Sequence, residues 1–177
     1  SFKICFLARV TPLKGIDVIL RLSDVLLKKQ INNITIDLYG PIEKGYEEEF
    51  NSKINKNKLV NYNGLIQPKQ IYNTLNSYDV LLLPTRYPGE GFPGTILESY
   101  ISGIPVIVSK WRHLPEFVKH GETGFLFDLD KEDDLYSFVK LLKNNPKKLY
   151  DMKLNALNES KLYSSSFAWS IIKKYLK

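Results

Sequence analysis

Two stretches near the middle of the chain are almost wholly apolar, and they restrict the possible folds more than any other feature. Asp79–Pro84 has only apolar residues after Asp79, and Pro105–Val108 has only apolar residues. A strand with one solvated face alternates apolar and polar side chains, so these runs indicate strands buried on both faces of a parallel sheet. Parallel strands need crossover connections, which place helices over the faces of the sheet.

Segments of strand length alternate with segments of helical period along the whole chain. Besides the two stretches above, strands are expected at residues 2–8, 34–39, 59–62 and 125–127. Helices are expected at residues 16–29, 43–56, 68–75, 93–102, 115–119, 131–142, 146–159 and 167–176. This alternation predicts an α/β fold, a Rossmann-like doubly wound parallel sheet of about six strands in the order 3-2-1-4-5-6, with helices on both faces.

The size and composition are those of one globular domain. The chain has 177 residues, of which 44% are hydrophobic and 25% charged. No apolar run approaches the ~20 residues of a membrane span. Cys5 is the single cysteine, so no disulfide can form within the chain, and we expect a cytoplasmic protein.

The excess of positive charge lies at the C-terminal end. The net charge is +6, and residues 140–177 contain nine lysines against Asp151 and Glu159. Lysines on the solvent-exposed face of a helix would explain this pattern. The functional alternative is peripheral contact with the anionic inner face of a membrane. We expect no nucleic-acid partner, because no basic run is interleaved with aromatic residues.

Charged residues follow the two strands that are expected to be neighbours at the centre of the sheet. Arg9 and Lys14 come after the first strand, and Glu90 comes after the fourth. In a doubly wound sheet, ligands bind beyond the carboxyl ends of the strands where the strand order reverses, here between strands 1 and 4. Arginine and lysine at that position favour an anionic ligand such as a phosphate.

The segment after Glu90 predicts a second phosphate contact. Gly94-Thr95-Ile96 begins a helix behind Pro93, so its free N–H groups and the helix dipole attract an anion. Glu98 lies one helical turn after Gly94 and shares its face. Glu90 and Glu98 lie on either side of this predicted phosphate-binding segment. Carboxylates accept hydrogen bonds from hydroxyls, so the two residues could bind hydroxyl groups of a sugar or a ribose.

Several motifs together resemble the group 1 retaining glycosyltransferases of the GT-B fold. They are Arg9 with Lys14-Gly15, Glu90-Gly91-Phe92 with Glu98, Gly103-Ile104-Pro105-Val106-Ile107, Pro115-Glu116-Phe117-Val118-Lys119-His120-Gly121 and Gly124-Phe125-Leu126-Phe127. The resemblance covers nearly the whole chain as the C-terminal, donor-binding domain. Two segments depart from it: Pro93 stands where glycine is more usual, and Trp111-Arg112-His113 replaces a stretch that usually contains glycine.

The resemblance implies a catalytic set of Arg9, Lys14 and Glu90. The two cations would neutralise the diphosphate of a nucleoside-diphosphate-sugar, and Glu90 would orient the transferred, hexose-like sugar. The departing nucleoside diphosphate develops negative charge, which cations and a helix start can stabilise. We therefore expect no metal and no other cofactor.

The resemblance also implies a donor-binding set. Glu98 would hold the ribose hydroxyls, and the N–H groups of Gly94, Thr95 and Ile96 would contact a phosphate. Gly40 would let the backbone pass close to the donor. Leu65 and Ile66 would hold the base, largely through their main chain.

The resemblance implies that residues 1–177 form a single donor-binding domain without the N-terminal acceptor domain of the family. We expect the full-length enzyme to transfer a sugar to a glycan or lipid-linked acceptor in polysaccharide biosynthesis. That acceptor would be bound by the missing domain or by a separate subunit, and the isolated domain would be inactive. Two alternatives share the fold: a non-catalytic nucleotide-binding or regulatory module, and a sugar-nucleotide epimerase.

Overall fold

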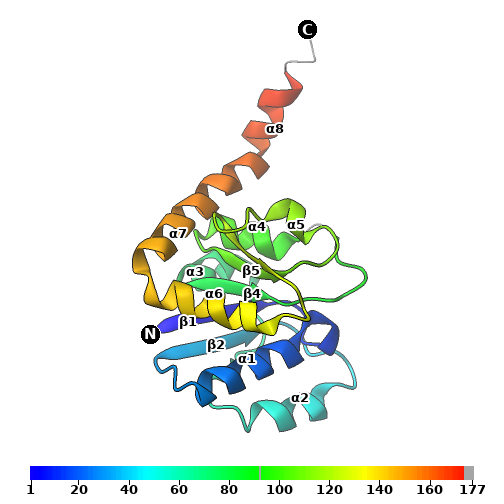
Figure 1. Cartoon of the computed structure of the whole chain (residues 1–177). Coiled ribbons are helices and arrows are strands. Elements are labelled where there is room, and N and C mark those ends of the chain that lie inside the picture. The colour runs from blue at the N-terminus through cyan, green and yellow to red at the C-terminus, as the bar shows by residue number, and fades with distance from the viewer. Residues whose placement is uncertain (92, 174–177) are drawn as a thin grey trace.

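A six-stranded parallel sheet forms the centre of the computed structural model, which describes residues 1–91 and 93–173 (Figure 1). Its strands are β1 (Phe2–Leu7), β2 (Ile34–Tyr39), β3 (Val60–Tyr62), β4 (Val80–Leu83), β5 (Val106–Ser109) and β6 (Gly124–Phe127). Their order is β3-β2-β1-β4-β5-β6, and every pairing is parallel. The predicted fold class and strand order are confirmed.

The inner strands carry the core. Every residue of β4 and β5 is buried, as the unbroken apolar runs predicted. The order reverses between β1 and β4, which pair directly, with Ile4 opposite Val80 and Cys5 opposite Leu81. The carboxyl ends of these two strands therefore lie side by side, and the loops that leave them share one edge of the sheet.

Helices connect the strands and cover both faces of the sheet. They are α1 (Ile16–Lys28), α2 (Glu47–Ile54), α3 (Ile71–Asn76), α4 (Gly94–Ile101), α5 (Leu114–Phe117), α6 (Glu132–Asn144), α7 (Pro146–Ser160) and α8 (Ser165–Ile172). Short 3-10 turns lie at Pro12–Lys14, Pro68–Gln70 and Lys161–Tyr163. Helix α1 packs against α6, whereas α4 packs against α3 and α7.

The second predicted helix is too long at its start. We expected it at residues 43–56, but α2 begins at Glu47. The segment before it is tied to the loop after β1: Val10 and Ile42 form an isolated parallel bridge, and the N–H of Glu43 donates to the oxygen of Val10. A turn at Lys44 and Gly45 follows, with Gly45 at a φ of 87°, so the helix begins only after this turn.

The last helix, α8, extends away from the sheet, whereas α7 packs against α4 and α6. Figure 1 shows α7 and α8 following one another toward the C-terminus, with α8 at the far end of the molecule. Phe167 and Trp169 of α8 are 39% and 52% exposed. The expected continuation of this helix to Leu176 lies outside the described residues. None of the described helices combines the length and the apolar character needed to cross a bilayer.

Candidate functional site

The loops that leave β1 and β4 meet at the carboxyl edge of the sheet. The N–H of Arg86 donates to the oxygen of Leu13 over 2.8 Å. A side chain on Gly15 would come within 2.1 Å of the oxygen of Pro84, so only glycine fits this approach. The two loops hold each other in place at the predicted switch point.

Lys14 and Glu90 form an ion pair at this meeting point. The Nζ atom of Lys14 lies 2.9 Å from Oε1 and 2.7 Å from Oε2 of Glu90. Their side chains are only 16% and 11% exposed, so water screens the pair weakly. The fold thus brings together two predicted catalytic residues, but in this structure each neutralises the other.

Two residues that the sequence analysis did not select complete this cluster. The hydroxyl of Thr85 donates to Oε2 of Glu90 over 2.7 Å. The ring of Tyr87 lies 4.8 Å below the Lys14 ammonium, a cation–π contact. Thr85 follows a wholly apolar strand at the switch point. Only this position in the sequence could have identified it as a candidate site residue.

Trp111 joins the cluster from the loop after β5. Its indole Nε1 donates to the oxygen of Tyr87 over 2.8 Å. This contact, together with its packing against the core, gives Trp111 a structural role within the Trp111-Arg112-His113 segment. Arg112 is exposed and has a positive φ of 51°, a conformation that is uncommon for a residue other than glycine.

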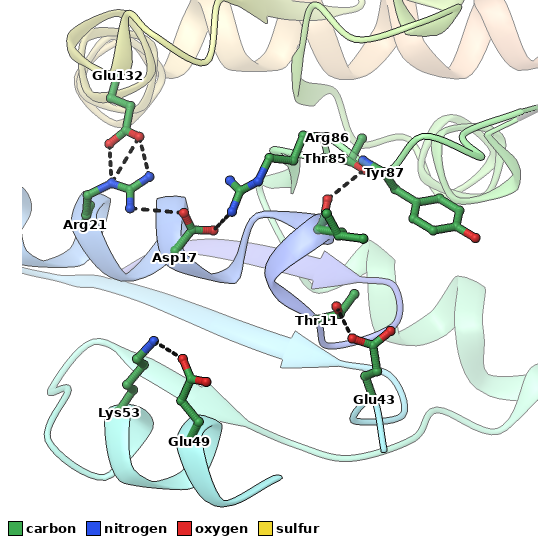
Figure 2. Close-up of polar contacts among 11 residues, drawn as sticks. Thr11, Asp17, Arg21, Glu43, Glu49, Lys53, Thr85, Arg86, Tyr87 and Glu132 are labelled. Atoms are coloured by element: carbon green, nitrogen blue, oxygen red, sulfur yellow. Dashed lines mark hydrogen bonds and ion pairs between the residues drawn. The ribbon is translucent and has the colours of Figure 1, made fainter. Parts of the chain in front are cut away.

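Arg9 lies on the β2 side of the site. It is exposed, and within the described part of the chain it makes no hydrogen bond or ion pair. Its loop is fixed to the loop after β2 by the Thr11 hydroxyl, which donates to Oε2 of Glu43 over 2.6 Å (Figure 2). Among the described residues, the Arg9 guanidinium is therefore free, on an anchored loop five residues before Lys14 in the chain.

Gly40 lies where the backbones of β1 and β2 end close together. A Cβ atom at this position would lie 1.9 Å from the oxygen of Ala8. The protein backbone itself therefore requires glycine here, whether or not a ligand approaches. The N–H of Gly40 donates to the oxygen of Gly64, and the hydroxyl of Tyr62 donates to the oxygen of Gly40.

These bonds fix the loop that was predicted to hold a base. Leu65 and Ile66 follow Gly64 in this loop, at the carboxyl end of β3. Leu65 is 67% exposed and Ile66 is half-buried. Their position at the same edge of the sheet as Gly40 is compatible with main-chain contacts to a ligand.

The start of α4 differs in one respect from the prediction. Helix α4 begins at Gly94, and the N–H of Ile96 donates to the oxygen of Pro93 over 2.9 Å. The expectation of a free Ile96 amide is therefore wrong, because Pro93 is turned so that its carbonyl accepts this bond. The side chain of Ile96 is buried in the core. The amides of Gly94 and Thr95 have no partner among the described residues.

Glu98 has an environment unlike that of Glu90. It lies in the second turn of α4, half-buried, and its carboxylate has no hydrogen-bond or ion-pair partner in the described part of the chain. Burial raises the pKa of this carboxyl above its ordinary value. A carboxylate that has lost water without gaining a partner would be stabilised by hydroxyl donors from a ligand.

A network of ion pairs links α1, α6 and the loop after β4 next to the site (Figure 2). Asp17 in α1 accepts from Arg86 over 2.9 Å and from Arg21 over 3.1 Å, and Arg21 also bonds Glu132 of α6. Burial would raise the pKa of Asp17, but the two guanidinium groups outweigh it and lower that pKa. The network ties the loop after β4 to α1 and α6, so its role is structural.

The described residues offer no group of three or more His, Cys, Asp or Glu side chains that could hold a metal ion. The site itself offers cations, carboxylates and main-chain amides. Arg9, Lys14, Glu90, Glu98 and the start of α4 all lie along the carboxyl edge of the sheet, on loops or a helix that follow β1 and β4.

Solved structures share this fold. A crystal structure of Alr3699/HepE from Anabaena in complex with UDP-glucose matches 90% of this chain and 44% of its own, with a TM-score of 0.78 and 22% identity. The C-terminal domain of the group 1 glycosyltransferase LpcC from Francisella tularensis matches 90% of this chain and 84% of its own, with a TM-score of 0.76 and 21% identity.

Proteins similar in sequence to most of this chain are also glycosyltransferases. The GtfA subunit of a UDP-N-acetylglucosamine–peptide N-acetylglucosaminyltransferase from Streptococcus agalactiae is 32% identical over 135 residues, which are 76% of this chain and 26% of that protein. The chain spans about two fifths of the length of the first curated relatives that it matches. Residues 1–159 match the family described as Glycosyl transferases group 1, and the chain belongs to that family.

Proposed function

We propose that this chain is the donor-binding domain of a retaining glycosyltransferase. It would bind a nucleoside-diphosphate-sugar, whose hexose-like sugar is transferred to a glycan or lipid-linked acceptor. One observation carries the proposal: Lys14 and Glu90, 76 residues apart in sequence, meet at the shared edge of β1 and β4, beside the loop that leads into α4. Membership of the group 1 glycosyltransferase family supports it.

The charges of the site suit a diphosphate. Arg9 has no partner among the described residues, and Lys14 can exchange its carboxylate partner for a phosphate oxygen. Within the part of the chain that the structure describes, the amides of Gly94 and Thr95 are uncommitted donors at a helix start, where the dipole favours negative charge. These groups would stabilise the charge that develops on the leaving nucleoside diphosphate, and we propose that no metal takes part.

The two carboxylates would hold the hydroxyl groups of the donor. Glu98 is half-buried and has no partner in residues 1–91 and 93–173, and two ribose hydroxyls would satisfy its oxygens. Glu90 would accept a hydroxyl of the sugar and thereby orient it. The backbone of Gly40, Leu65 and Ile66 would contact the base and ribose side of the nucleotide.

UDP-sugars are the first donors to test. The HepE structure was determined with UDP-glucose, and the name of the streptococcal relative specifies UDP-N-acetylglucosamine. A panel of UDP, GDP, ADP and TDP with their glucose and N-acetylglucosamine conjugates would be titrated by isothermal calorimetry. We expect the nucleotide and nucleotide-sugars of one base to bind, with dissociation constants below about 1 mM. Absence of binding by the whole panel would overturn the proposal.

The acceptor would be bound by chain outside these 177 residues. The longer relatives support this division, because each is more than twice the length of the matched part. We expect donor binding but no transfer by this chain alone, and transfer by a longer protein that includes it, in cytoplasmic polysaccharide synthesis. Donor binding without transfer by the longer protein would favour a non-catalytic regulatory module.

We also propose that α7 contacts an anionic membrane surface. Tyr150, Leu154 and Leu157 form an exposed apolar stripe on one side of this helix, 61%, 43% and 43% exposed. Lys147 and Lys161 lie at the two ends of the stripe and are exposed. Cosedimentation with vesicles of phosphatidylcholine and 30% phosphatidylglycerol should retain the chain, and vesicles of phosphatidylcholine should not. Equal retention by both would contradict an electrostatic contact.

A further inference from the structure

Thr85 is a buried polar residue two positions after the end of β4. It is fully buried, with 0% of its surface exposed. Its Oγ1 lies 2.7 Å from Oε2 of Glu90 and 3.5 Å from the oxygen of Leu13. A hydroxyl has one proton to donate, and the shorter contact to a charged acceptor takes it. Thr85 therefore donates to Glu90.

The position of the Thr85 hydroxyl is fixed by its neighbours. The buried Ser109 of β5 donates from Oγ to the backbone oxygen of Thr85 over 2.6 Å. The N–H of Tyr87 donates to Oγ1 of Thr85 over 3.1 Å, and Trp111 bonds the oxygen of Tyr87. These bonds hold the backbone and the side chain of Thr85 independently of Lys14.

The two oxygens of Glu90 have different partners. Among the described residues, Oε1 is bonded to Lys14 alone, whereas Oε2 is bonded to both Lys14 and Thr85. A diphosphate that draws Lys14 away would leave Oε1 without a partner. Oε2 would keep the bond from Thr85, so the carboxylate would stay in place with one free oxygen.

We propose that Thr85 is the positioning residue for Glu90. By anchoring Oε2, it presents Oε1 to a hydroxyl of the donor sugar once the diphosphate has engaged Lys14. This inference rests on the proposed function, because it needs a nucleoside-diphosphate-sugar in the site. It goes further by naming the residue that sets the contact to the sugar and the oxygen that makes it.

The test compares UDP with the tighter of UDP-glucose and UDP-N-acetylglucosamine by calorimetry on the 177-residue chain. Thr85→Val removes the hydroxyl while keeping the shape, and Thr85→Ser keeps the hydroxyl. We expect Thr85→Val to leave the UDP dissociation constant within twofold and to weaken UDP-sugar binding about tenfold. Thr85→Ser should restore UDP-sugar binding to within about threefold of the wild type.

Thr123→Val is the matched control. The Thr123 hydroxyl is also buried, accepts from a backbone N–H, that of Lys119, and bonds a second side chain, Tyr100, but it lies before β6 at the opposite edge of the sheet. Urea denaturation should show comparable losses of stability for Thr85→Val and Thr123→Val. Only Thr85→Val should change the ratio of UDP-sugar to UDP dissociation constants.

A double-mutant cycle separates positioning from a general structural role. If Thr85 acts through the Glu90 carboxylate, Thr85→Val should change the ratio less than twofold in a Glu90→Gln background. Equal weakening of UDP and UDP-sugar by Thr85→Val, or the same tenfold effect in the Glu90→Gln background, would overturn the inference. Failure of the wild-type chain to bind UDP and both UDP-sugars would instead overturn UDP-sugar as the donor class.

Discussion

The ammonium of Lys14 lies within 2.9 Å of both carboxylate oxygens of Glu90, and this pair joins the loops after β1 and β4. In the structure, the cation proposed to bind a diphosphate is already neutralised by this carboxylate. Anion binding must therefore compete with Glu90 for Lys14. The competition links the phosphate contact to the release of the carboxylate that would hold the sugar.

Glu90→Gln should strengthen the binding of UDP. The substitution removes the charge that competes for Lys14. Even an exposed ion pair contributes up to about 1 kcal/mol, and this one is largely buried, so we expect UDP affinity to rise at least about fivefold. UDP-sugar affinity should not rise with it, because the proposed contact to the sugar is weakened at the same time. Calorimetric titration of both ligands measures the two effects.

Glu132→Gln is the control for this experiment. Glu132 is also a carboxylate in an ion pair, but its partner is Arg21, which belongs to the supporting network. Its loss should leave UDP affinity unchanged. If Glu90→Gln leaves UDP affinity the same or lowers it, Lys14 does not bind the diphosphate in exchange for Glu90.

Arg9→Gln should weaken UDP binding without destabilising the fold. Arg9 is exposed and makes no bond within the described residues, so its removal costs the folded protein little. A charge-assisted contact to a phosphate is worth about 1.5–3 kcal/mol, which corresponds to a loss of at least tenfold in affinity. The free energy of unfolding, from urea denaturation, should stay within about 0.5 kcal/mol of the wild type.

Arg21→Gln should show the opposite behaviour. Arg21 bonds both Asp17 and Glu132, so its loss should lower the free energy of unfolding by about 1 kcal/mol while UDP affinity is kept. An Arg9→Gln variant that binds UDP as tightly as the wild type would remove Arg9 from the proposed site.

The strand order and the meeting of two loops could be predicted because they depend on patterns that span whole elements. The apolar runs in β4 and β5 identified buried strands, and the order reversal placed the loops of Lys14 and Glu90 together. Each inference required only the period of the side chains and the topology of a doubly wound sheet.

Individual bonds could not be predicted, because they depend on the course of the backbone within loops. The amide of Ile96 is occupied because Pro93 has a ψ of 80° and turns its carbonyl toward the helix. The Lys14–Glu90 pair and the Thr85 hydroxyl bond likewise follow from how the loop after β4 turns back. A single threonine after a strand belongs to no repeating pattern of side chains, so its role cannot be recognised from the sequence.

Glu98→Gln should stabilise the folded chain at neutral pH. Burial raises the pKa of Glu98 in the folded state above its value in the unfolded chain, so the folded state binds the proton more tightly. The charged carboxylate therefore costs stability above the folded pKa, and this cost disappears as the pH falls below the unfolded value. The gain from glutamine should stay under about 1 kcal/mol, because the side chain is only half-buried.

Urea denaturation of both proteins between pH 3 and pH 8 would measure this effect. The difference in the free energy of unfolding should grow as the pH rises and should vanish in acid. The same substitution should weaken UDP binding by about tenfold, since the proposed ribose contact loses a charged acceptor. A variant that is less stable than the wild type at pH 7 would contradict an unpaired carboxylate.

Gly15→Ala should be among the most damaging small substitutions in the chain. Gly15 has a φ of +85°, and a Cβ atom would lie 2.1 Å from the oxygen of Pro84. The methyl group would force apart the loops that bring Lys14 to Glu90, and we expect a loss of about 3 kcal/mol or more in the free energy of unfolding.

Gly103→Ala separates the backbone cost from the steric cost of this change. Gly103 also has a positive φ, of 69°, but a Cβ atom there would meet nothing within 4 Å. Its replacement should cost only the left-handed conformation, about 1 kcal/mol. Urea denaturation of the two variants measures the difference. Equal losses would mean that the loops after β1 and β4 can separate freely, and the close approach of Lys14 and Glu90 would then not depend on glycine at position 15.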